Sequence, residues 1–220
     1  MIPVKICGIT SVKDAELAIE KGAAAIGLIF YNHSPRNVSV ETAKEIVQYV
    51  KGNVPIVGVF VDKDVALVKS MCLKVNLDIL QLHGNENPQY CEQFNLPIIK
   101  VFRVGPKFDK SQLVDYNVSA FLFDTYNKEL LGGTGVHFDW ELISNIKIET
   151  PIILSGGLTP PNVLSGVEVV NPSAVDVNSG VEDSPGVKNQ EKLIELFNKT
   201  GITGKDENIF HKIKFGTLNV

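Results

Sequence analysis

Short apolar runs alternate with longer amphipathic stretches along most of this chain, and this alternation predicts strands that are each followed by a helix. Eight runs are strand candidates: 4–8, 25–30, 56–61, 79–84, 98–104, 120–124, 151–157 and 174–178. Helical stretches are expected at 11–21 (capped by Thr10), 40–50, 62–74, 88–94, 111–116, in a segment opened by Asp139, and at 161–167 and 188–198. The chain therefore reads as eight strand–helix units.

The strand candidates are apolar throughout, which indicates that both faces of the sheet are covered, as in a parallel sheet. Their starts recur roughly every 19 to 30 residues, a spacing that suits an eight-stranded barrel. The alternative, an open doubly wound sheet that binds a dinucleotide, normally carries GxGxxG after its first strand. Cys7-Gly8-Ile9-Thr10 stands there instead, and Walker A is absent. We predict the α/β class and a single-domain (β/α)8 TIM barrel.

No linker or low-complexity segment divides the chain, so residues 1–200 are expected to form one barrel domain. Residues 201–220 follow the last expected helix and show no clear helical period. We expect this C-terminal tail, of unknown role, to lie on the surface or to be partly disordered.

Composition narrows the functional classes. A net charge of −4 and a pI near 5.6 argue against a nucleic-acid partner. No apolar run approaches the ~18 residues of a membrane span. The first strand begins almost at once, which leaves no room for a signal peptide, and the three scattered cysteines form no CxxC pair. A cytoplasmic protein without a disulfide framework or a zinc site is the expectation.

Two glycine turns near the end of the chain indicate a phosphate site. Gly156-Gly157 closes the seventh strand candidate, and Ser179-Gly180 follows the eighth. Consecutive backbone N–H groups in such turns bind anions, and the loops after strands seven and eight of TIM barrels often hold phosphate.

Polar residues at the carboxyl ends of the strands are the candidates for chemistry, because barrel active sites lie there. Cys7, His83, Asp124 and Asp176 end strand candidates one, four, six and eight, and Arg36 lies in the loop after the second. Each also has a structural interpretation. A lone cysteine is more often a small buried hydrophobe, Asp124 can cap its loop, a strand-end histidine is often satisfied locally, and an arginine after Pro35 is exposed by default.

Two further features leave alternatives open. Lys5 and Lys100 are Schiff-base candidates, although a strand lysine can simply pair with an interior carboxylate. Gly132-Gly133-Thr134-Gly135 is either a flexible connector or a mobile lid.

Together, these segments resemble the phosphoribosylanthranilate isomerase family, over almost everything from residue 4 to about 199. The matching segments, in order, are Val4–Thr10, Ser34–Arg36, Val57–Val61, Gln81–Gly84, Phe123–Thr125, Gly132–Gly135 with Phe138–Trp140, Leu154–Leu158 and Asp176–Glu182. Each segment is weak alone, but eight in register are specific. The tail 201–220 extends past the point where the family's barrel normally closes.

The resemblance implies the Amadori rearrangement of N-(5′-phosphoribosyl)anthranilate in tryptophan biosynthesis, without a cofactor or metal. It implies that Asp124 is the general acid at the furanose oxygen and Cys7 the general base at C2′. Arg36 would bind the anthranilate carboxylate, for which a guanidinium is suited. Gly156, Gly157, Ser179 and Gly180 would hold the phosphate through their backbone, and His83 and Asp176 would line the pocket. The partner would be this small phosphorylated substrate, with a monomer as the default.

These roles make opposite demands on the two groups. A free cysteine is only a few per cent thiolate at pH 7, and a free aspartic acid is almost fully ionised there. Burial raises the pKa of both, which helps an acid and hinders a base. We therefore expect an apolar setting for Asp124, preceded by Phe121, Leu122 and Phe123, and a more polar one for Cys7.

Alternatives remain at this point. A metal-dependent pentose-phosphate epimerase would need several His and carboxylate ligands at strand ends, where only His83 is placed. A Schiff-base enzyme using Lys5 or Lys100 and a non-catalytic phosphate-ligand binding barrel are the others. Use of the related histidine-pathway substrate is also open.

Overall fold

Eight parallel strands close into a barrel, as the apolar pattern predicted. The computed structural model describes residues 1–50, 52–125, 139–204 and 207–216. The strands pair in sequence order, and β1 closes the ring by pairing with β8, Lys5 opposite Asp176. They are β1 Val4–Ile6, β2 Ala25–Ile29, β3 Ile56–Phe60, β4 Ile79–Leu82, β5 Ile98–Val104, β6 Ala120–Thr125, β7 Ile152–Leu154 and β8 Ala174–Val177. The TIM-barrel prediction is confirmed, and each strand lies within the predicted run or one residue beyond it at β6.

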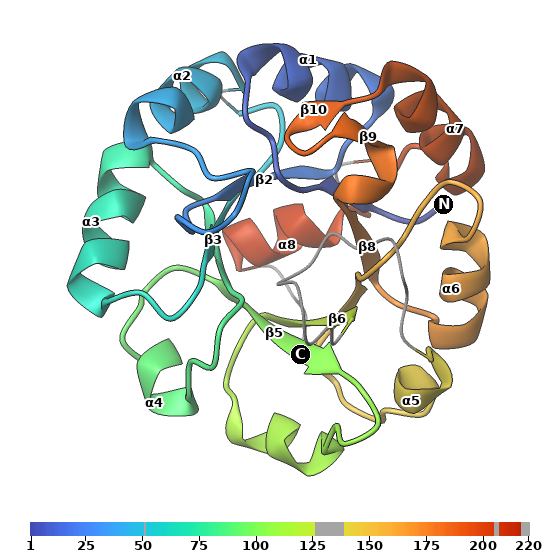
Figure 1. The fold of residues 1–220 in the computed structure, drawn as a ribbon. Helices are drawn as coiled ribbons and strands as arrows, with labels where there is room; N and C mark the ends of the chain where they lie inside the picture. Colours follow the sequence, from blue (N-terminus) through green and yellow to red (C-terminus); the bar gives the residue numbers. More distant parts are fainter. Residues whose placement is uncertain (51, 126–138, 205–206, 217–220) are drawn as a thin grey trace.

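Helices ring the barrel on its outside (Figure 1). They are α1 Val12–Lys21, α2 Val40–Val50, α3 Val65–Val75, α4 Pro88–Cys91, the 3₁₀ helix η1 Lys110–Asp115, α5 Glu141–Ser144, α6 Val163–Val170 and α7 Gln190–Thr200. The predicted cap of α1 is wrong by one residue, since Ser11 accepts from Asp14 N–H while the Thr10 hydroxyl donates to the Gly186 carbonyl. A serine hydroxyl at this position satisfies an N–H that the first turn leaves free.

Side chains alternate between the two faces of each strand, and this alternation decides what reaches the site. Leu80, Leu82, Phe121 and Phe123 belong to the core between the strands and the outer helices. Inward positions near the strand starts carry the apolar floor, which includes Ile79, Ile99 and Leu122. Polar inward side chains are concentrated toward the strand ends, where the pocket described below opens.

A short hairpin follows β8 that the apolar pattern did not predict. The 3₁₀ helix η2 Ser179–Val181 leads into β9 Glu182–Ser184, which pairs antiparallel with β10 Val187–Lys188. The hairpin turns at Gly186, where φ is +85°, a conformation that glycine adopts without strain. It brings Glu182 and Lys188, both buried, to the carboxyl end of the barrel.

The prediction that residues 201–220 form a surface tail is wrong for 209–215. These residues form helix α8, Ile209–Phe215, which lies across the centre of the ring of strands in Figure 1. Ile209, Phe210 and Ile213 are buried in one cluster with residues that begin the strands, among them Ala25, Val57, Ile79, Ala120 and Ala174. The helix therefore closes the amino end of the barrel, opposite the site.

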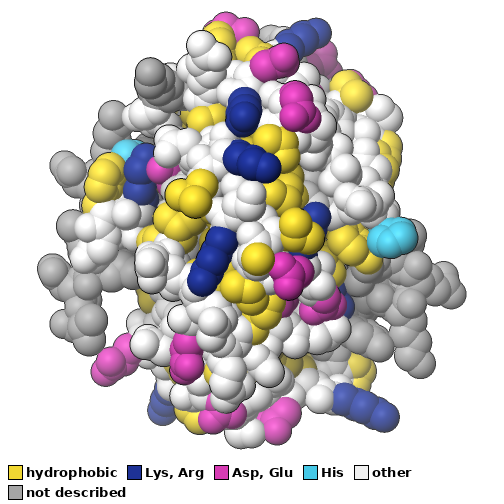
Figure 2. All heavy atoms as spheres, turned by 90° about the vertical axis from the view of Figure 1, so that its left-hand side faces the viewer, with side chains coloured by type: hydrophobic (Ala, Val, Ile, Leu, Met, Phe, Trp, Pro, Cys, Tyr) yellow, Lys and Arg dark blue, Asp and Glu magenta, His cyan; other side chains and the backbone are white. Residues whose placement is uncertain are grey.

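Charged side chains of both signs are interspersed with apolar ones on the face seen in Figure 2. That face lacks the single-sign charge typical of a nucleic-acid footprint. Within the described residues, no helix combines the length and apolarity that crossing a membrane requires.

Candidate active site

One pocket opens at the carboxyl ends of the strands and gathers most of the predicted site residues. Its lining includes Cys7, Arg36, His83, Asp124, Gly156, Gly157, Asp176 and Ser179. Of the predicted set, Gly180 alone is not part of this lining. The sequence segments that supply these residues are far apart, and closure of the barrel brings their strand ends together.

Cys7 lies at the bottom of the pocket beside a buried ion pair. It is 4% exposed and packs with Ile29 and Val59. Lys5, two residues earlier on the same face, is fully buried, and its Nζ lies 2.9 Å from Asp176 Oδ1. A Cβ added to Gly27 on β2 would stand 2.8 Å from Cys7 Sγ and 3.0 Å from Lys5 Nζ. The glycine thus leaves the space in which thiol and ammonium approach each other.

The electrostatic balance at Cys7 has opposing contributions. Burial raises the pKa of the Cys7 thiol, the Lys5 and Lys188 ammonium groups lower it, and the Asp176 carboxylate raises it, with a raised pKa as the result. Burial by itself lowers the pKa of Lys5, but Asp176 and Cys7 raise it by more than burial lowers it. The pKa of Lys5 is therefore raised, and Lys5 stays charged. The ammonium is therefore the main neighbour that favours the thiolate.

Asp124 lies at the end of β6 among polar groups. Its Oδ2 is 3.0 Å from His83 Nε2, and its Oδ1 accepts the Thr125 N–H at 2.7 Å. The expectation of an apolar setting for Asp124 is wrong, since Phe121 and Phe123 point outward to the helices. The setting of Cys7 is mixed, with the Lys5–Asp176 ion pair on one side and aliphatic side chains on the other.

Arg36 is buried and not an exposed loop charge. Its Nε lies 3.0 Å from both carboxylate oxygens of Glu182, and its Nη2 lies 2.6 Å from Oε2. Lys188 Nζ binds the same carboxylate at 2.7 Å. Burial raises the pKa of Glu182, but Arg36 and Lys188 lower it more, so the pKa is below its ordinary value. The carboxylate fixes the guanidinium at the pocket wall, and Arg36 Nη1 has no hydrogen-bond partner among the described residues.

The two glycine turns meet at the pocket edge between β6 and β1. Gly156 and Gly157 have φ of +84° and +67°, and within the described part of the chain their N–H groups donate to no acceptor. A Cβ on Gly180 would collide with the Leu158 carbonyl, so η2 packs directly on the Gly156-Gly157 turn. Free N–H groups in left-handed turns form an anion-binding concavity.

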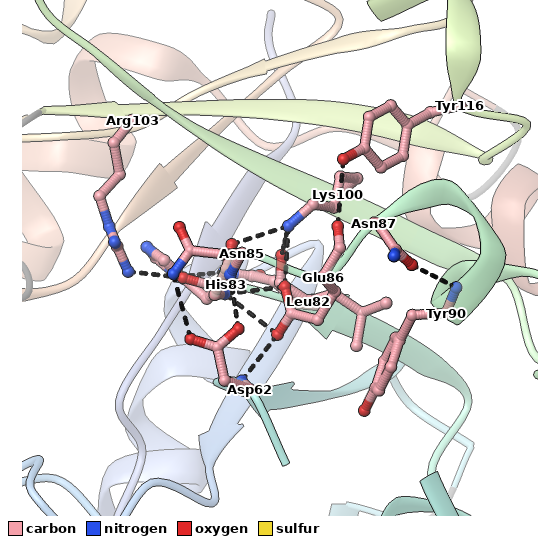
Figure 3. A network of polar contacts seen from close by, with 12 residues as sticks. Asp62, Leu82, His83, Asn85, Glu86, Asn87, Tyr90, Lys100, Arg103 and Tyr116 are labelled. Atoms are coloured by element: carbon pink, nitrogen blue, oxygen red, sulfur yellow. Dashed lines mark hydrogen bonds and ion pairs between the residues drawn. The ribbon is translucent and has the colours of Figure 1, made fainter. Parts of the chain in front are cut away.

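Lys100, one of the Schiff-base candidates, points away from the pocket. Its Nζ binds Glu86 Oε2 at 2.8 Å and the Gly84 carbonyl at 2.9 Å, on the outer side of β4 and β5 (Figure 3). Lys5 faces the barrel interior but is held by Asp176. These contacts give both lysines the structural role of pairing with a buried carboxylate.

Several pocket residues were not predicted from the sequence. Gln81, Arg103 and Asn178 line the pocket, and Glu182 binds Arg36 and is itself paired with Lys188. Strand alternation offered a signal for Gln81, which shares a face with His83, but Lys188 depends on the unpredicted hairpin. The Gly132–Gly135 segment, predicted as a connector or lid, lies outside the described residues. Within those residues, no group of three His, Cys, Asp or Glu side chains is placed to hold a metal ion.

Comparison with known proteins gives one consistent family. The model of the N-(5′-phosphoribosyl)anthranilate (PRA) isomerase family matches residues 4–199. The N-(5′-phosphoribosyl)anthranilate isomerase of Geotalea uraniireducens (strain Rf4) is 43% identical over 199 residues, covering 90% of this chain and 98% of the relative.

Solved structures agree with that match. Monomers of the dimeric isomerase from Thermotoga maritima superpose with a TM-score of 0.80 at 35% identity, covering 92% of this chain and 100% of theirs. An isomerase in complex with reduced 1-(o-carboxyphenylamino)-1-deoxyribulose 5-phosphate gives the same score, identity and coverage. Both cover the barrel, so fold and sequence point the same way.

Proposed function

This chain belongs to the N-(5′-phosphoribosyl)anthranilate isomerase family and catalyses the Amadori rearrangement of tryptophan biosynthesis, and we propose that Cys7 and Asp124 carry its proton transfers. The substrate is an N-glycoside of ribose 5-phosphate, and the product is 1-(2-carboxyphenylamino)-1-deoxyribulose 5-phosphate. The rearrangement opens the furanose ring and moves hydrogen from C2′ to C1′. It requires an acid near the ring oxygen and a base near C2′.

Asp124 is the proposed acid. Its proton passes to the ring oxygen as the C1′–O bond breaks, which leaves an iminium between C1′ and nitrogen. Asp124 lies near the end of β6 and Cys7 directly follows β1, with β7 and β8 between them in the closed ring. The glycine turns after β7 and β8 would therefore hold the phosphate between the two catalytic groups.

Cys7 is the proposed base. Its thiolate takes the C2′ proton, the electron pair moves to the iminium, and an enolamine forms. Protonation at C1′ and loss of the C2′ hydroxyl proton then give the ketone, so the proton count closes. The Lys5 ammonium favours the thiolate against the effect of burial. Because burial still leaves the pKa of the thiol raised, only a minor thiolate population reacts at neutral pH.

The remaining pocket residues would bind and orient the substrate. Arg36 is held by Glu182, and its free Nη1 can donate hydrogen bonds to the anthranilate carboxylate. The backbone N–H groups of Gly156, Gly157, Ser179 and Gly180 would hold the phosphate. His83 and Asp176 line the pocket and fix Asp124 and Lys5.

The observation that carries these roles is the convergence of Cys7 and Asp124 on one pocket. Proton transfer by a positioned group typically contributes 10²–10⁴-fold. We expect Cys7→Ala and Asp124→Asn each to lower kcat by at least about 10²-fold. Turnover is measured by the loss of fluorescence as the anthranilate adduct is consumed. Near-normal turnover by either variant would remove that residue from the mechanism, and normal thermal stability of both variants is the control.

We also propose a cytoplasmic monomer with residues 1–200 as its catalytic domain. All three cysteines are buried and free, as expected in a reducing compartment. Because α8 covers the amino end of the barrel with residues of the same chain, that apolar floor is closed without a partner. Light scattering after size-exclusion chromatography tests the monomer, and a dimer mass at micromolar concentration would contradict it.

A further inference from the structure

Gln81 is a buried polar side chain whose carbonyl end is unsatisfied. It lies on β4, is 1% exposed and lines the pocket. Its Nε2 is 3.3 Å from His83 Nδ1, while its Oε1 has no hydrogen-bond partner among the described residues. Buried carbonyl groups without a partner are rare because they lose hydration without compensation. The Gln81 Oε1 atom is therefore available as a hydrogen-bond acceptor in the pocket.

A half-turn of the Gln81 amide exchanges its two ends and changes what His83 presents to Asp124. With Nε2 toward His83, the imidazole accepts at Nδ1 and carries its hydrogen on Nε2. With Oε1 toward His83, Nδ1 carries a hydrogen and donates it to Gln81. After uptake of one proton from solvent, His83 and Asp124 together carry two protons, one on Nδ1 and one between His83 Nε2 and Asp124 Oδ2, which are 3.0 Å apart.

We propose that Gln81 is a positioning residue for the acid proton, its Oε1 accepting Nδ1–H of His83 so that His83 and Asp124 hold that proton together. The inference rests on the proposed role of Asp124 as the acid. In the loaded pair, the proton lies on either Nε2 or Oδ2, and Nδ1–H is donated to Gln81 in both forms. The pair, and not the carboxyl group alone, is the acid of the reaction.

The cycle balances. Asp124 gives the proton to the ring oxygen as the ring opens, and the pair is left with a neutral imidazole and a carboxylate. A proton returns through His83, whose side chain is 21% exposed, while Gln81 Oε1 continues to accept from Nδ1–H.

The groups around the pair hold it in place and contribute charge. Arg103 on β5 donates from Nη2 to the His83 carbonyl at 2.7 Å (Figure 3). Glu86 accepts from the Gly84 N–H and is paired with Lys100, while Asp62 after β3 accepts from the Asn85 N–H. The other charged or titratable groups of the same pocket are Cys7, Tyr31, Arg36 and Asp176, with Lys5 paired to Asp176. Arg103 is the nearby cation without a carboxylate partner among the described residues.

The direct test is the tautomer of His83 in the wild-type protein. Two-bond ¹H–¹⁵N correlation spectra of histidine-labelled protein distinguish Nδ1–H, Nε2–H and doubly protonated rings, and His83→Asn identifies the signal among four histidines. We expect His83 at pH 7 to be protonated at Nδ1. A ring that is Nε2–H alone from pH 6 to 8 would overturn the proposal.

Substitutions at Gln81 give predictions in opposite directions. Gln81→Leu removes the acceptor. The limb of the pH profile at which kcat falls, as the His83–Asp124 pair loses its proton, should then move downward by about one to two pH units, the effect of one charge-assisted hydrogen bond. Gln81→Glu provides a permanent acceptor and should move the same limb upward. A purely structural role would lower activity in both variants without moving the limb, and that result would also overturn the proposal.

The controls separate this inference from the proposed mechanism. Gln112→Leu, on η1, should leave the pH profile unchanged. If Asp124→Asn retains turnover, the acid role fails whatever the tautomer of His83. If Asp124→Asn is inactive but the Gln81 variants keep the wild-type limb, only the Gln81 proposal fails.

Discussion

At the scale of single residues, we expect the reactivity of Cys7 to depend on Lys5, which takes part in no bond change of the proposed reaction. Burial disfavours the thiolate, and the ammonium beside it offsets part of that effect. Asp176 keeps Lys5 charged in a fully buried position. Lys5 on β1 and Cys7 directly after it are therefore expected to function as a unit, and the absence of a side chain at Gly27 gives them room.

Lys5→Met should raise the pKa of the Cys7 thiol further and slow its alkylation. Each unit of pKa lowers the thiolate fraction, and hence the rate with iodoacetamide at fixed pH, by about tenfold. The alkylated peptide, followed by mass spectrometry, distinguishes Cys7 from Cys72 and Cys91, whose pKa values burial raises to about 11. Lys100→Met is the matched control, a buried lysine on the outer side of the sheet. The double variant Lys5→Met with Asp176→Asn avoids an unpaired carboxylate, and its Cys7 should still be alkylated more slowly than in the wild type. Alkylation at the wild-type rate would contradict the role of Lys5.

Arg36→Ala should act mainly on binding. Removing a charge-assisted hydrogen bond to a carboxylate should raise KM by about 10- to 100-fold, with a smaller change in kcat. Arg36→Lys keeps the charge but loses the planar fork, so its KM should lie between that of the wild type and that of Arg36→Ala. Steady-state kinetics decide the matter, and a fall in kcat at unchanged KM would argue against carboxylate binding.

The positions of the catalytic candidates followed from the sequence, but their surroundings did not. A strand end places Cys7 or Asp124 at the mouth of a barrel whatever the rest of the chain does. The neighbours across the barrel are set by register, which one chain segment does not reveal. Phe121 and Phe123 flank Asp124 in sequence but face the helices, while His83, from another strand, touches its carboxyl group.

At the scale of elements, the strands were predictable because burial on both faces requires continuous apolar runs. The predicted 98–104 coincides with β5, and 40–50 coincides with α2. Short elements such as α4 and η1 carry too few turns for a reliable period. Helix α8 was missed for the same reason, and because its burial depends on the barrel floor, where Ala25, Ala120 and Ala174 leave space that Phe210 fills.

Phe210→Ala should reduce the free energy of unfolding by about 3–5 kcal/mol, the usual range for a buried phenylalanine. Phe210 is fully buried, whereas Phe215 on the same helix is 63% exposed. Phe215→Ala is therefore the control and should change stability by no more than about 0.5 kcal/mol. Urea unfolding measures both. Because α8 lies at the amino end of the barrel, kcat of folded Phe210→Ala should match the wild type, and a stability loss no larger than that of Phe215→Ala would show that the helix does not close the floor.

At the scale of the whole molecule, buried ion pairs join the first two strand–helix units of the barrel to the last one. Lys5 and Asp176 pair across the β1–β8 seam, and Arg36 reaches Glu182 over the same side of the ring. Because these contacts connect the first units to the last, they should contribute to the free energy of unfolding of the entire barrel as well as to the local geometry of the site.

Glu182 makes this connection dependent on pH. Its pKa in the folded protein is below the ordinary 4.5 because of Arg36 and Lys188, despite burial. A carboxyl group with a depressed folded pKa contributes stability above its unfolded pKa, and this contribution is lost as pH falls through the folded value. The free energy of unfolding should accordingly decrease below about pH 4.5 more steeply than in a protein without this group.

Glu182→Gln removes that contribution and leaves Arg36 and Lys188 buried without their counter-charge. The variant should therefore be less stable than the wild type at pH 7, and the difference should shrink as pH falls below the ordinary 4.5 of a glutamate. Urea unfolding from pH 7 to pH 3 measures the difference. Glu195→Gln, which breaks an exposed pair with Lys199 at 3.0 Å, should change stability little at any pH. A difference between Glu182→Gln and wild type that stays constant across this range would mean that Glu182 acts through shape and not through charge, and that its charge does not join the loop after β2 to the segment after β8.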